Sequence, residues 1–176
     1  MSLCTGVGRL IAIAACSGAA VLVWPANCAA APSGKLMDML PQGFSSANCQ
    51  EKDPSPPGVD PPALERVMCD PSSDPSGPSF AVFLLFANPT DLANGFQQGP
   101  GSSGYTVASS CPGGIASPGA WNYRNSGQTS GQVECGTSVE GNPAVIWTDN
   151  AKLRLACVEG KGQDIASLYQ WWSDKS

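Results

Sequence analysis

Carboxylates are the side chains best suited to acid–base chemistry in this chain, because it contains no histidine. Two convergent carboxylates can hydrolyse a glycosidic bond, one of them as the acid and the other as base or nucleophile. Six acidic residues lie close together in the sequence: Glu51, Asp53, Asp60, Glu65, Asp70 and Asp74. Most of them stand among prolines and serines, and carboxylates in such loops are usually solvated. A carboxylate-based hydrolase of the cell envelope is therefore an alternative, not the favoured function.

Other catalytic patterns are missing from the sequence. Without histidine the chain lacks the commonest general base near neutral pH, and a Ser-His-Asp or Cys-His site is impossible within one chain. It contains no G-x-S-x-G, Walker A or dinucleotide-binding pattern. Asp70 and Asp74 lack the spacing and ligand count of a calcium loop. We therefore expect a protein that is not an enzyme, with no catalytic residues, no metal site and no cofactor.

Cysteines indicate a disulfide-bonded domain. Five of them follow the N-terminal segment: Cys49, Cys69, Cys111, Cys135 and Cys157. Two bridges among five thiols allow fifteen pairings, and we favour pairs that are neighbours in sequence. The predicted disulfides are Cys49–Cys69 and Cys111–Cys135. Cys157 falls on the apolar face of an alternating strand, where we expect a free, buried and unreactive thiol.

Aromatic side chains in the second half of the chain could line a binding groove or complete the core. Trp121 and Tyr123 share one face of a predicted strand, and Trp147 lies on a later strand. Trp171 falls about 110° from the centre of the apolar stripe of the last helix. Arg124 is the lone basic residue of this region and could hold an anionic ligand or form a surface ion pair. These five residues are the candidate ligand-binding set.

Residues 1–31 have the pattern of a secretory signal peptide. Arg9 precedes an uncharged, mostly apolar run from Leu10 to Trp24, and small residues follow at 29–31. Two alternatives remain: a retained membrane span, although such spans need about 20 apolar residues, and lipidation at Cys16. Only a retained or lipidated segment would bring membrane contact. We therefore expect a secreted or cell-envelope protein that folds in an oxidising space.

Composition limits the architecture and the partners. Residues 32–176 are sufficient for one domain. A net charge of −5 disfavours nucleic acid and anionic membrane surfaces as partners. Twenty glycines and sixteen prolines predict many turns and few long helices. The expected partner is a small molecule, an envelope component or another protein.

Periodicity in the sequence predicts an α+β fold. Apolar alternation indicates strands at 64–69, 80–86, 105–108, 120–124, 132–137, 143–148 and 152–159. Helical patterns occur at 35–40, at 89–98 after the capping residue Asn88, and at 164–173. The proline-rich residues 50–62 have the composition of a loop, and so do the glycine-rich residues 99–120 on either side of the short strand at 105–108. Short connections favour antiparallel pairing, which predicts a single antiparallel, twisted sheet with packed helices and two disulfides.

Several motifs resemble secreted mycobacterial and related actinobacterial proteins. The segments are L-P-Q-G-F-S-S-A-N-C (40–49), C-P-G-G (111–114), G-Q-V-E-C-G (131–136), A-V-I-W-T-D-N-A-K-L-R-L (144–155) and L-Y-Q-W-W (168–172). This family is similar to the extracytoplasmic sensor module of some actinobacterial serine/threonine kinases. The resemblance implies a disulfide-pinned α+β domain with a ligand-binding cleft. We therefore expect a non-catalytic, sensor-like binding domain, with a purely structural envelope protein as a further alternative.

Overall fold

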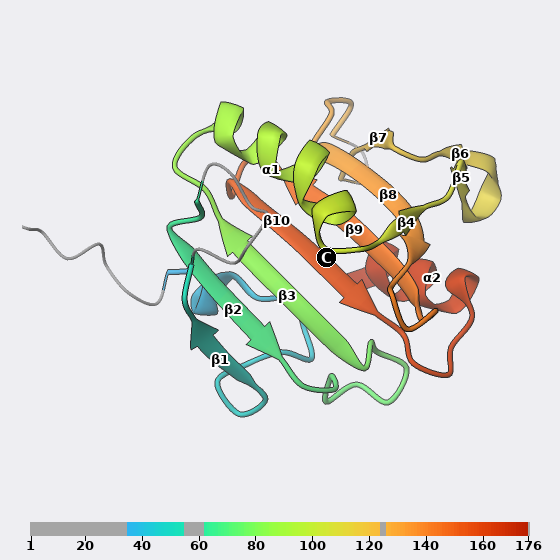
Figure 1. Ribbon diagram of the computed structural model, residues 1–176, viewed down its shortest axis with the longest axis horizontal. Helices are drawn as coiled ribbons and strands as arrows, with labels where there is room; N and C mark the ends of the chain where they lie inside the picture. The colour runs from blue at the N-terminus through green and yellow to red at the C-terminus, as the bar shows by residue number, and fades with distance from the viewer. Residues whose placement is uncertain (1–34, 55–61, 124–125, 176) are drawn as a thin grey trace, which may run out of the picture.

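The computed structural model describes residues 35–54, 62–123 and 126–175 (Figure 1). The predicted signal segment 1–31, which contains Cys16, lies outside the described residues, and so does Arg124. Within the described ranges, no helix is long and apolar enough to cross a membrane. Export, lipidation and anchoring therefore stay predictions from the sequence.

One large antiparallel sheet forms most of the fold (Figure 1). Its strands are β1 (Cys49–Lys52), β2 (Glu65–Cys69), β3 (Phe80–Leu85), β4 (Thr106–Val107), β7 (Gly119–Trp121), β8 (Gly131–Thr137), β9 (Pro143–Asp149) and β10 (Arg154–Glu159). They pair in the order β1-β2-β3-β10-β9-β8-β4, and β7 also pairs with β8. The predicted antiparallel sheet and the hairpin of β9 and β10 are confirmed.

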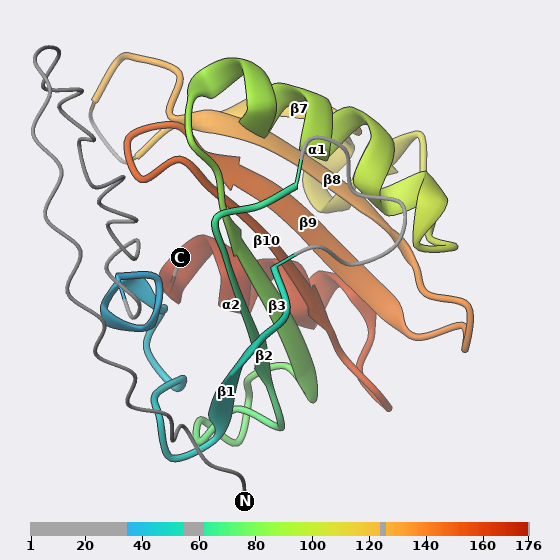
Figure 2. The same cartoon turned by 60° about the vertical axis from the view of Figure 1, so that its left-hand side comes forward.

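Two α-helices, α1 (Pro89–Ser102) and α2 (Ile165–Lys175), lie on opposite faces of this sheet (Figure 2). The Asn88 side chain caps α1 by accepting a hydrogen bond of 2.9 Å from the backbone N–H of Asp91, as the sequence predicts. A 3-10 turn, η1 (Met37–Met39), precedes β1. Much of the described chain is sheet, and each face has one α-helix.

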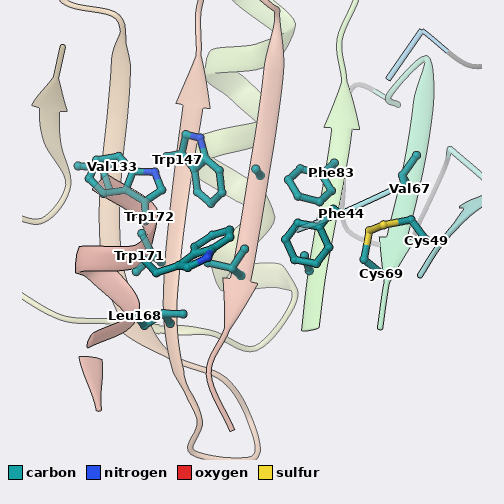
Figure 3. Close-up of a cluster of buried hydrophobic side chains, with 14 of the residues drawn as sticks. Phe44, Cys49, Val67, Cys69, Phe83, Val133, Trp147, Leu168, Trp171 and Trp172 are labelled. Atoms are coloured by element: carbon teal, nitrogen blue, oxygen red, sulfur yellow. A yellow bond between two sulfur atoms is a disulfide. The ribbon is translucent and has the colours of Figure 1, made fainter. Parts of the chain in front are cut away.

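The face beneath α2 carries the larger hydrophobic cluster (Figure 3). Trp172 of α2 packs edge-on against the fully buried Trp147 of β9, with ring centroids 6.1 Å apart. Phe44, from the segment before β1, makes similar contacts with Phe83 of β3 at 5.5 Å and with Trp171 at 6.0 Å. Two covering elements, α2 and the segment that carries Phe44, therefore close this face together.

Both predicted disulfides are confirmed. Cys49–Cys69 joins directly opposed positions of β1 and β2, and Cys111–Cys135 ties β5 to β8. The strand β5 (Ser110–Cys111) pairs with β6 (Ile115–Ala116) across the 3-10 turn η2 (Pro112–Gly114). Cys157 is the free cysteine of the described residues, as predicted. One bridge thus lies within the large sheet, and the other joins this sheet to the two-stranded sheet of β5 and β6.

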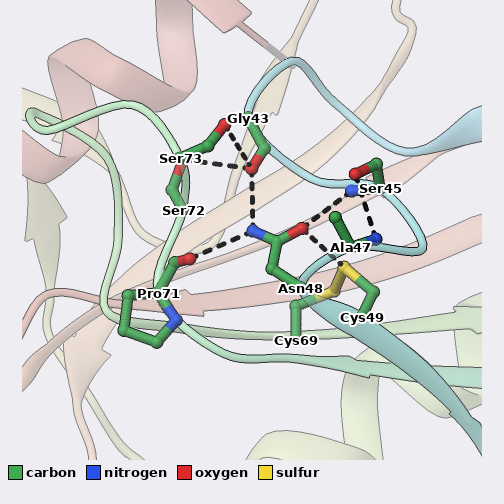
Figure 4. The surroundings of a disulfide bond; sticks show 9 residues. All are labelled: Gly43, Ser45, Ala47, Asn48, Cys49, Cys69, Pro71, Ser72 and Ser73. Carbon is green, nitrogen blue, oxygen red and sulfur yellow. Dashed lines mark hydrogen bonds between the residues drawn. A yellow bond between two sulfur atoms is a disulfide. The ribbon is translucent and has the colours of Figure 1, made fainter.

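The Asn48 side chain organises the turn that leads into β1 (Figure 4). Its Nδ2 donates to the carbonyl oxygens of Gly43 and Pro71, at 3.0 Å each, and its Oδ1 accepts from the backbone N–H of Ser45 at 2.9 Å. These bonds join the segment before β1 to the chain that leaves β2. The neighbouring Cys49–Cys69 bridge holds the same two segments covalently.

Two loop predictions are wrong. The loop expected over 50–62 begins as strand β1, whose last three residues are exposed. Charged, exposed residues are typical of sheet edges, and they conceal a strand from any search for apolar alternation. Within the glycine-rich residues 99–120, the short strand expected at 105–108 is present as β4, but β5 and β6 were not expected. Each of them has only two residues, which is too short for apolar alternation to show.

Helix α1 also extends four residues beyond its predicted end at residue 98. Glycine and proline at 99–101 normally end a helix. Here the carbonyl oxygen of Gly99 accepts from the N–H of Ser103 at 2.9 Å, and that of Pro100 accepts from the N–H of Tyr105 at 3.0 Å. These bonds satisfy the final carbonyl groups, and burial of Gly99 and Pro100 against the sheet compensates for their low helix propensity.

Candidate functional site

A pocket of about 240 Å³ opens on the face of the sheet that carries α1. The helix contacts β9 and β10, so the same face of β2 and β3 is left without a helix above it. Strands supply most of the described lining, and the end of α1 supplies the rest: Arg66, Met68, Phe80, Val82, Leu84, Gly99, Pro100, Ser103, Tyr105, Ile146, Leu155 and Cys157. The incomplete cover of this face therefore creates the pocket.

Strand register explains why these side chains converge. Met68 of β2 is opposite Val82 of β3, Val82 is opposite Cys157 of β10, and Cys157 is opposite Ile146 of β9. Directly opposed residues of antiparallel strands point to the same face. The row crosses three spacings between strands, about 14 Å in all. Apolar side chains thus form a continuous floor across four strands.

Arg66 places a positive charge at one edge of the pocket. Its Nη2 lies 3.1 Å from the thioether sulfur of Met68, which is a weak acceptor. Its Nε is buried and has no hydrogen-bond partner within the described parts of the chain. A guanidinium group offers five N–H donors, and the Met68 sulfur is the one acceptor found for them among the described residues. The group can therefore accept an anionic partner.

The opposite end of the pocket contains a phenol and a thiol. The hydroxyl of Tyr105 donates a short hydrogen bond to Oε1 of the buried Glu159. Burial, followed by the neighbouring Cys157 and Glu159, raises the pKa of Tyr105 above its ordinary value. Burial and two nearby carboxylates raise the pKa of Cys157 to about 12. Both groups therefore stay protonated at neutral pH, and Cys157 is no activated nucleophile.

Cys157 differs in one respect from its predicted environment. The sequence predicts a fully buried thiol, whereas the side chain is half-buried and borders the pocket. The strand alternation correctly places Cys157 on an apolar face. Whether Cys157 is covered on that face depends on the position of α1. The periodicity of a single strand does not predict that position.

Glu134 of β8 is a second buried acid on this face. It is opposite Ile146, its side chain is only 5% exposed, and its Oε1 has no hydrogen-bond partner among the described residues. Burial alone raises its pKa to about 7. Glu134 and Glu159 are two strands apart and shifted by two residues, which separates their Cα atoms by about 12 Å. The two acids therefore lie on the same face of the sheet but not at neighbouring positions.

The five predicted ligand-binding residues are not gathered at one place. Trp147 of β9 and Trp171 of α2 are buried in the core between α2 and the sheet, and Arg124 lies outside the described residues. Trp121 and Tyr123 line a shallower hollow of about 600 Å³ together with residues of α2. Of the predicted set, the structure therefore brings only Trp121 and Tyr123 to a common surface depression, which we call the aromatic hollow.

Tyr123 also belongs to a buried ionic network. Its hydroxyl donates to Oδ2 of Asp149 at 2.7 Å, and the same oxygen lies 3.0 Å from Nζ of Lys152 and 3.7 Å from Nη2 of Arg154. Burial opposes ionisation of Asp149, but the bonds from Tyr123 and Lys152 and the two positive charges lower its pKa below its usual value. The network therefore gives Tyr123 a structural role beside the hollow.

Sequence reasoning missed the polar residues of the α1 face: Arg66, Tyr105, Glu134 and Glu159. One signal was available in the sequence. Glu159 is an acid at the position where the alternation of Leu155 and Cys157 predicts the next apolar side chain. No signal in one strand could show that Glu159 meets Tyr105, which is 54 residues away.

No group of three or more histidine, cysteine or acidic side chains able to hold a metal ion occurs within the described residues. Comparisons of the chain with protein-family models, with curated proteins and with solved structures find no match. Function has to be inferred from the residues of the site.

Proposed function

We propose that the protein is a secreted or cell-envelope, non-catalytic domain that binds a small, mostly apolar molecule in the pocket beside α1. One observation carries the proposal: an apolar floor that spans four strands has a few polar groups at its ends. Ligand sites in proteins have this composition, and perturbed pKa values often accompany them. The motifs that resemble extracytoplasmic sensor modules favour the same function.

The chemistry of the pocket supports binding rather than catalysis. Cys157 and Tyr105 are protonated at neutral pH. Glu159 already accepts a hydrogen bond from Tyr105, and Glu134 lies two strands away from it. Without histidine, no ordinary base remains to activate a nucleophile. The same residues are well suited to hold a molecule that presents both apolar and polar parts.

Filling the pocket from the helix side tests the proposal. Gly99 lines the pocket, and a Cβ atom added there would meet no atom within 4 Å. A Gly99→Leu side chain is therefore expected to occupy the pocket without displacing neighbours. Gly101→Leu is the matched control, because Gly101 is exposed on the same helix and has the same free space.

The probe is phenylnaphthylamine, a neutral apolar dye whose fluorescence rises on burial. We expect saturable binding to the wild type and to Gly101→Leu, and at least tenfold weaker binding to Gly99→Leu. Equal binding by Gly99→Leu and Gly101→Leu would overturn the proposal. Loss of binding on Tyr169→Ala instead would move the site to the aromatic hollow, whose wall includes Tyr169.

Export is tested separately by the intact mass of the protein recovered from outside the cytoplasm. Cleavage near residue 31, two disulfides and one thiol are expected. An unprocessed cytoplasmic chain with all its thiols reduced would contradict the secreted part of the proposal.

A further inference from the structure

We infer that the ligand of this pocket is a single-chain amphiphile whose anionic head group binds Arg66 and whose alkyl chain lies along the floor of the pocket. The inference rests on the proposed function and names the chemical class that the pocket selects. The shared chemistry is an anionic oxygen head group, either a carboxylate or a phosphate.

Arg66 has hydrogen-bonding capacity that the described residues do not use. Of the described lining residues it alone is charged, and it forms no ion pair with any described residue. Its nearest polar contact is the Met68 sulfur, while its buried Nε has no partner. Buried donors in proteins are normally satisfied, so a missing partner has to be explained. A bound carboxylate or phosphate would supply the acceptor, and a guanidinium group binds both in a bidentate manner.

A second positive charge stands beside the first. Lys52 of β1 is directly opposite Arg66 of β2, so both side chains leave the same face of the sheet. Like charges at directly opposed positions are unfavourable. An anion bound between or above them would relieve this repulsion. Two adjacent cations are notable in a chain of net charge −5, whose basic residues number only nine.

The floor of the pocket sets the position of the alkyl chain. Arg66 is opposite Leu84, and Leu84 is opposite Leu155, so an apolar row begins directly at the guanidinium group. Val82 and Ile146 continue the apolar surface toward β9. A cavity of about 150 Å³ accepts benzene, and this pocket is larger, at about 240 Å³. A medium-length alkyl chain is therefore of suitable size.

Charge at the far end fixes the orientation of the ligand. The acids Glu134 and Glu159 lie on the β8 and β10 side, and Glu159 already accepts a hydrogen bond from Tyr105. An anionic head group would be repelled there and attracted at Arg66. The pocket is thus polarised along its length, with its positive end at the edge formed by β1 and β2.

Displacement of phenylnaphthylamine by matched eight-carbon ligands tests the inference. The ligands are octanoate, octyl phosphate and octan-1-ol, and the proteins are the wild type, Arg66→Gln, Arg66→Lys and Lys161→Gln. Lys161 is exposed and does not line the pocket, so Lys161→Gln controls for a change in net charge. Thermal melts establish that each variant is folded.

In the wild type we expect an anionic ligand to bind about tenfold to a hundredfold more tightly than octan-1-ol, the range typical of a hydrogen bond to a charged group. Arg66→Gln should abolish this preference without changing the affinity for octan-1-ol. Arg66→Lys should retain part of it, because the charge persists without the planar fork. Lys161→Gln should behave like the wild type. Comparison of octanoate with octyl phosphate then identifies the head group.

The outcomes separate the inference from the proposed function. Equal affinity for octan-1-ol and both anions, unchanged by Arg66→Gln, overturns the anionic head group while the pocket remains a binding site. Failure of all three ligands and of the dye to bind the wild type overturns the proposed function as well. An anion preference that Arg66→Gln leaves intact also contradicts the inference, because another cation must then hold the head group.

Discussion

The two faces of the sheet are closed by different means. On one face, α2 and the segment that carries Phe44 pack aromatic rings against Phe83 and Trp147 (Figure 3). On the other face, α1 alone covers only part of the sheet, and a pocket remains over β2, β3 and β10. Aromatic side chains fill the first face and leave the aromatic hollow beside α2, while the second face leaves apolar surface that a ligand could cover.

Polar groups are also distributed differently between the faces. The buried charges of the α2 face, Asp149 and Arg154, form an ion pair with each other. On the α1 face, the buried Glu134 forms no ion pair with a described residue, and neither does the half-buried Arg66. Each face also has buried polar atoms without a hydrogen-bond partner among the described residues, such as Nε of Arg154 on the α2 face and Oε1 of Glu134 on the α1 face. The faces therefore differ in how their charges are paired.

The largest expected effect comes from breaking the ionic network of the α2 face. Asp149→Asn would leave Arg154 buried without a counter-charge, and we expect the free energy of unfolding to fall by about 3–5 kcal/mol. Urea denaturation at pH 7 measures it. Asp38→Asn, at an exposed position, is the matched control and should change stability by at most about 0.5 kcal/mol. Similar effects of the two substitutions would contradict the role of the network.

The pH dependence of the same network has a definite sign. The folded-state pKa of Asp149 is lowered, so its contribution to stability is fully present above the unfolded pKa. It is lost as the pH falls through the folded pKa. In denaturation measured from pH 7 to pH 2, Asp149→Asn should therefore lose less stability than the wild type.

Glu134 on the α1 face should show the opposite sign. Its folded pKa of about 7 is above its ordinary value of 4.5, so its stabilising effect is complete below pH 4.5 and is lost as the pH rises through 7. Glu134→Gln removes this dependence. Relative to the variant, the wild type should lose about 3 kcal/mol between pH 4 and pH 8, as urea denaturation at both values can show. Parallel pH profiles would indicate that Glu134 is not buried as a carboxyl group.

The same substitution, valine to alanine, can be made on each face to compare how tightly the two faces are packed. Val158 of β10 is fully buried on the α2 face, whereas Val82 of β3 borders the pocket. Val158→Ala should cost about 2 kcal/mol, because both lost transfer energy and a new cavity contribute. Val82→Ala should cost about 1 kcal/mol or less, since open space already exists beside it. Equal losses in chemical denaturation would mean that the pocket is closed in solution.

The smallest effect concerns two buried glycines of α1. A Cβ atom at Gly99 would meet open space, so Gly99→Ala should stabilise the protein by about 0.5–1 kcal/mol through helix propensity. At Gly95 the added atom would lie 2.5 Å from Cζ of Phe86, so Gly95→Ala should destabilise by about 1 kcal/mol net. Thermal melts compare the two variants. A shift of the same sign in both would contradict the geometry of the pocket roof.

Local patterns in the sequence correctly predicted much of the fold. Alternation predicted the strands from β2 onward except the two-residue strands β5 and β6, Asn88 predicted the start of α1, and neighbouring cysteines predicted both bridges. Charged residues concealed β1. Trp171 shows where a helical wheel fails, because α2 is buried on two sides, against the sheet and against Phe44. A second covering element cannot be deduced from the periodicity of one helix.

The candidate site was much less accessible to prediction from sequence. The aromatic residues singled out as a groove include Trp147 and Trp171, which lie in the core. The pocket instead depends on Arg66, Tyr105 and Cys157, which come from distant parts of the chain. Their convergence depends on strand order, and β3 pairs with β10 across some 70 residues of intervening chain.

By itself, the sequence determined which segments alternate, which cysteines can pair and which catalytic classes are impossible, because these properties depend on residue type and short-range spacing. Only the tertiary structure decided which apolar face would be filled and which would remain open. That outcome depends on where two short helices lie on a sheet of eight strands, and packing between distant segments sets their positions.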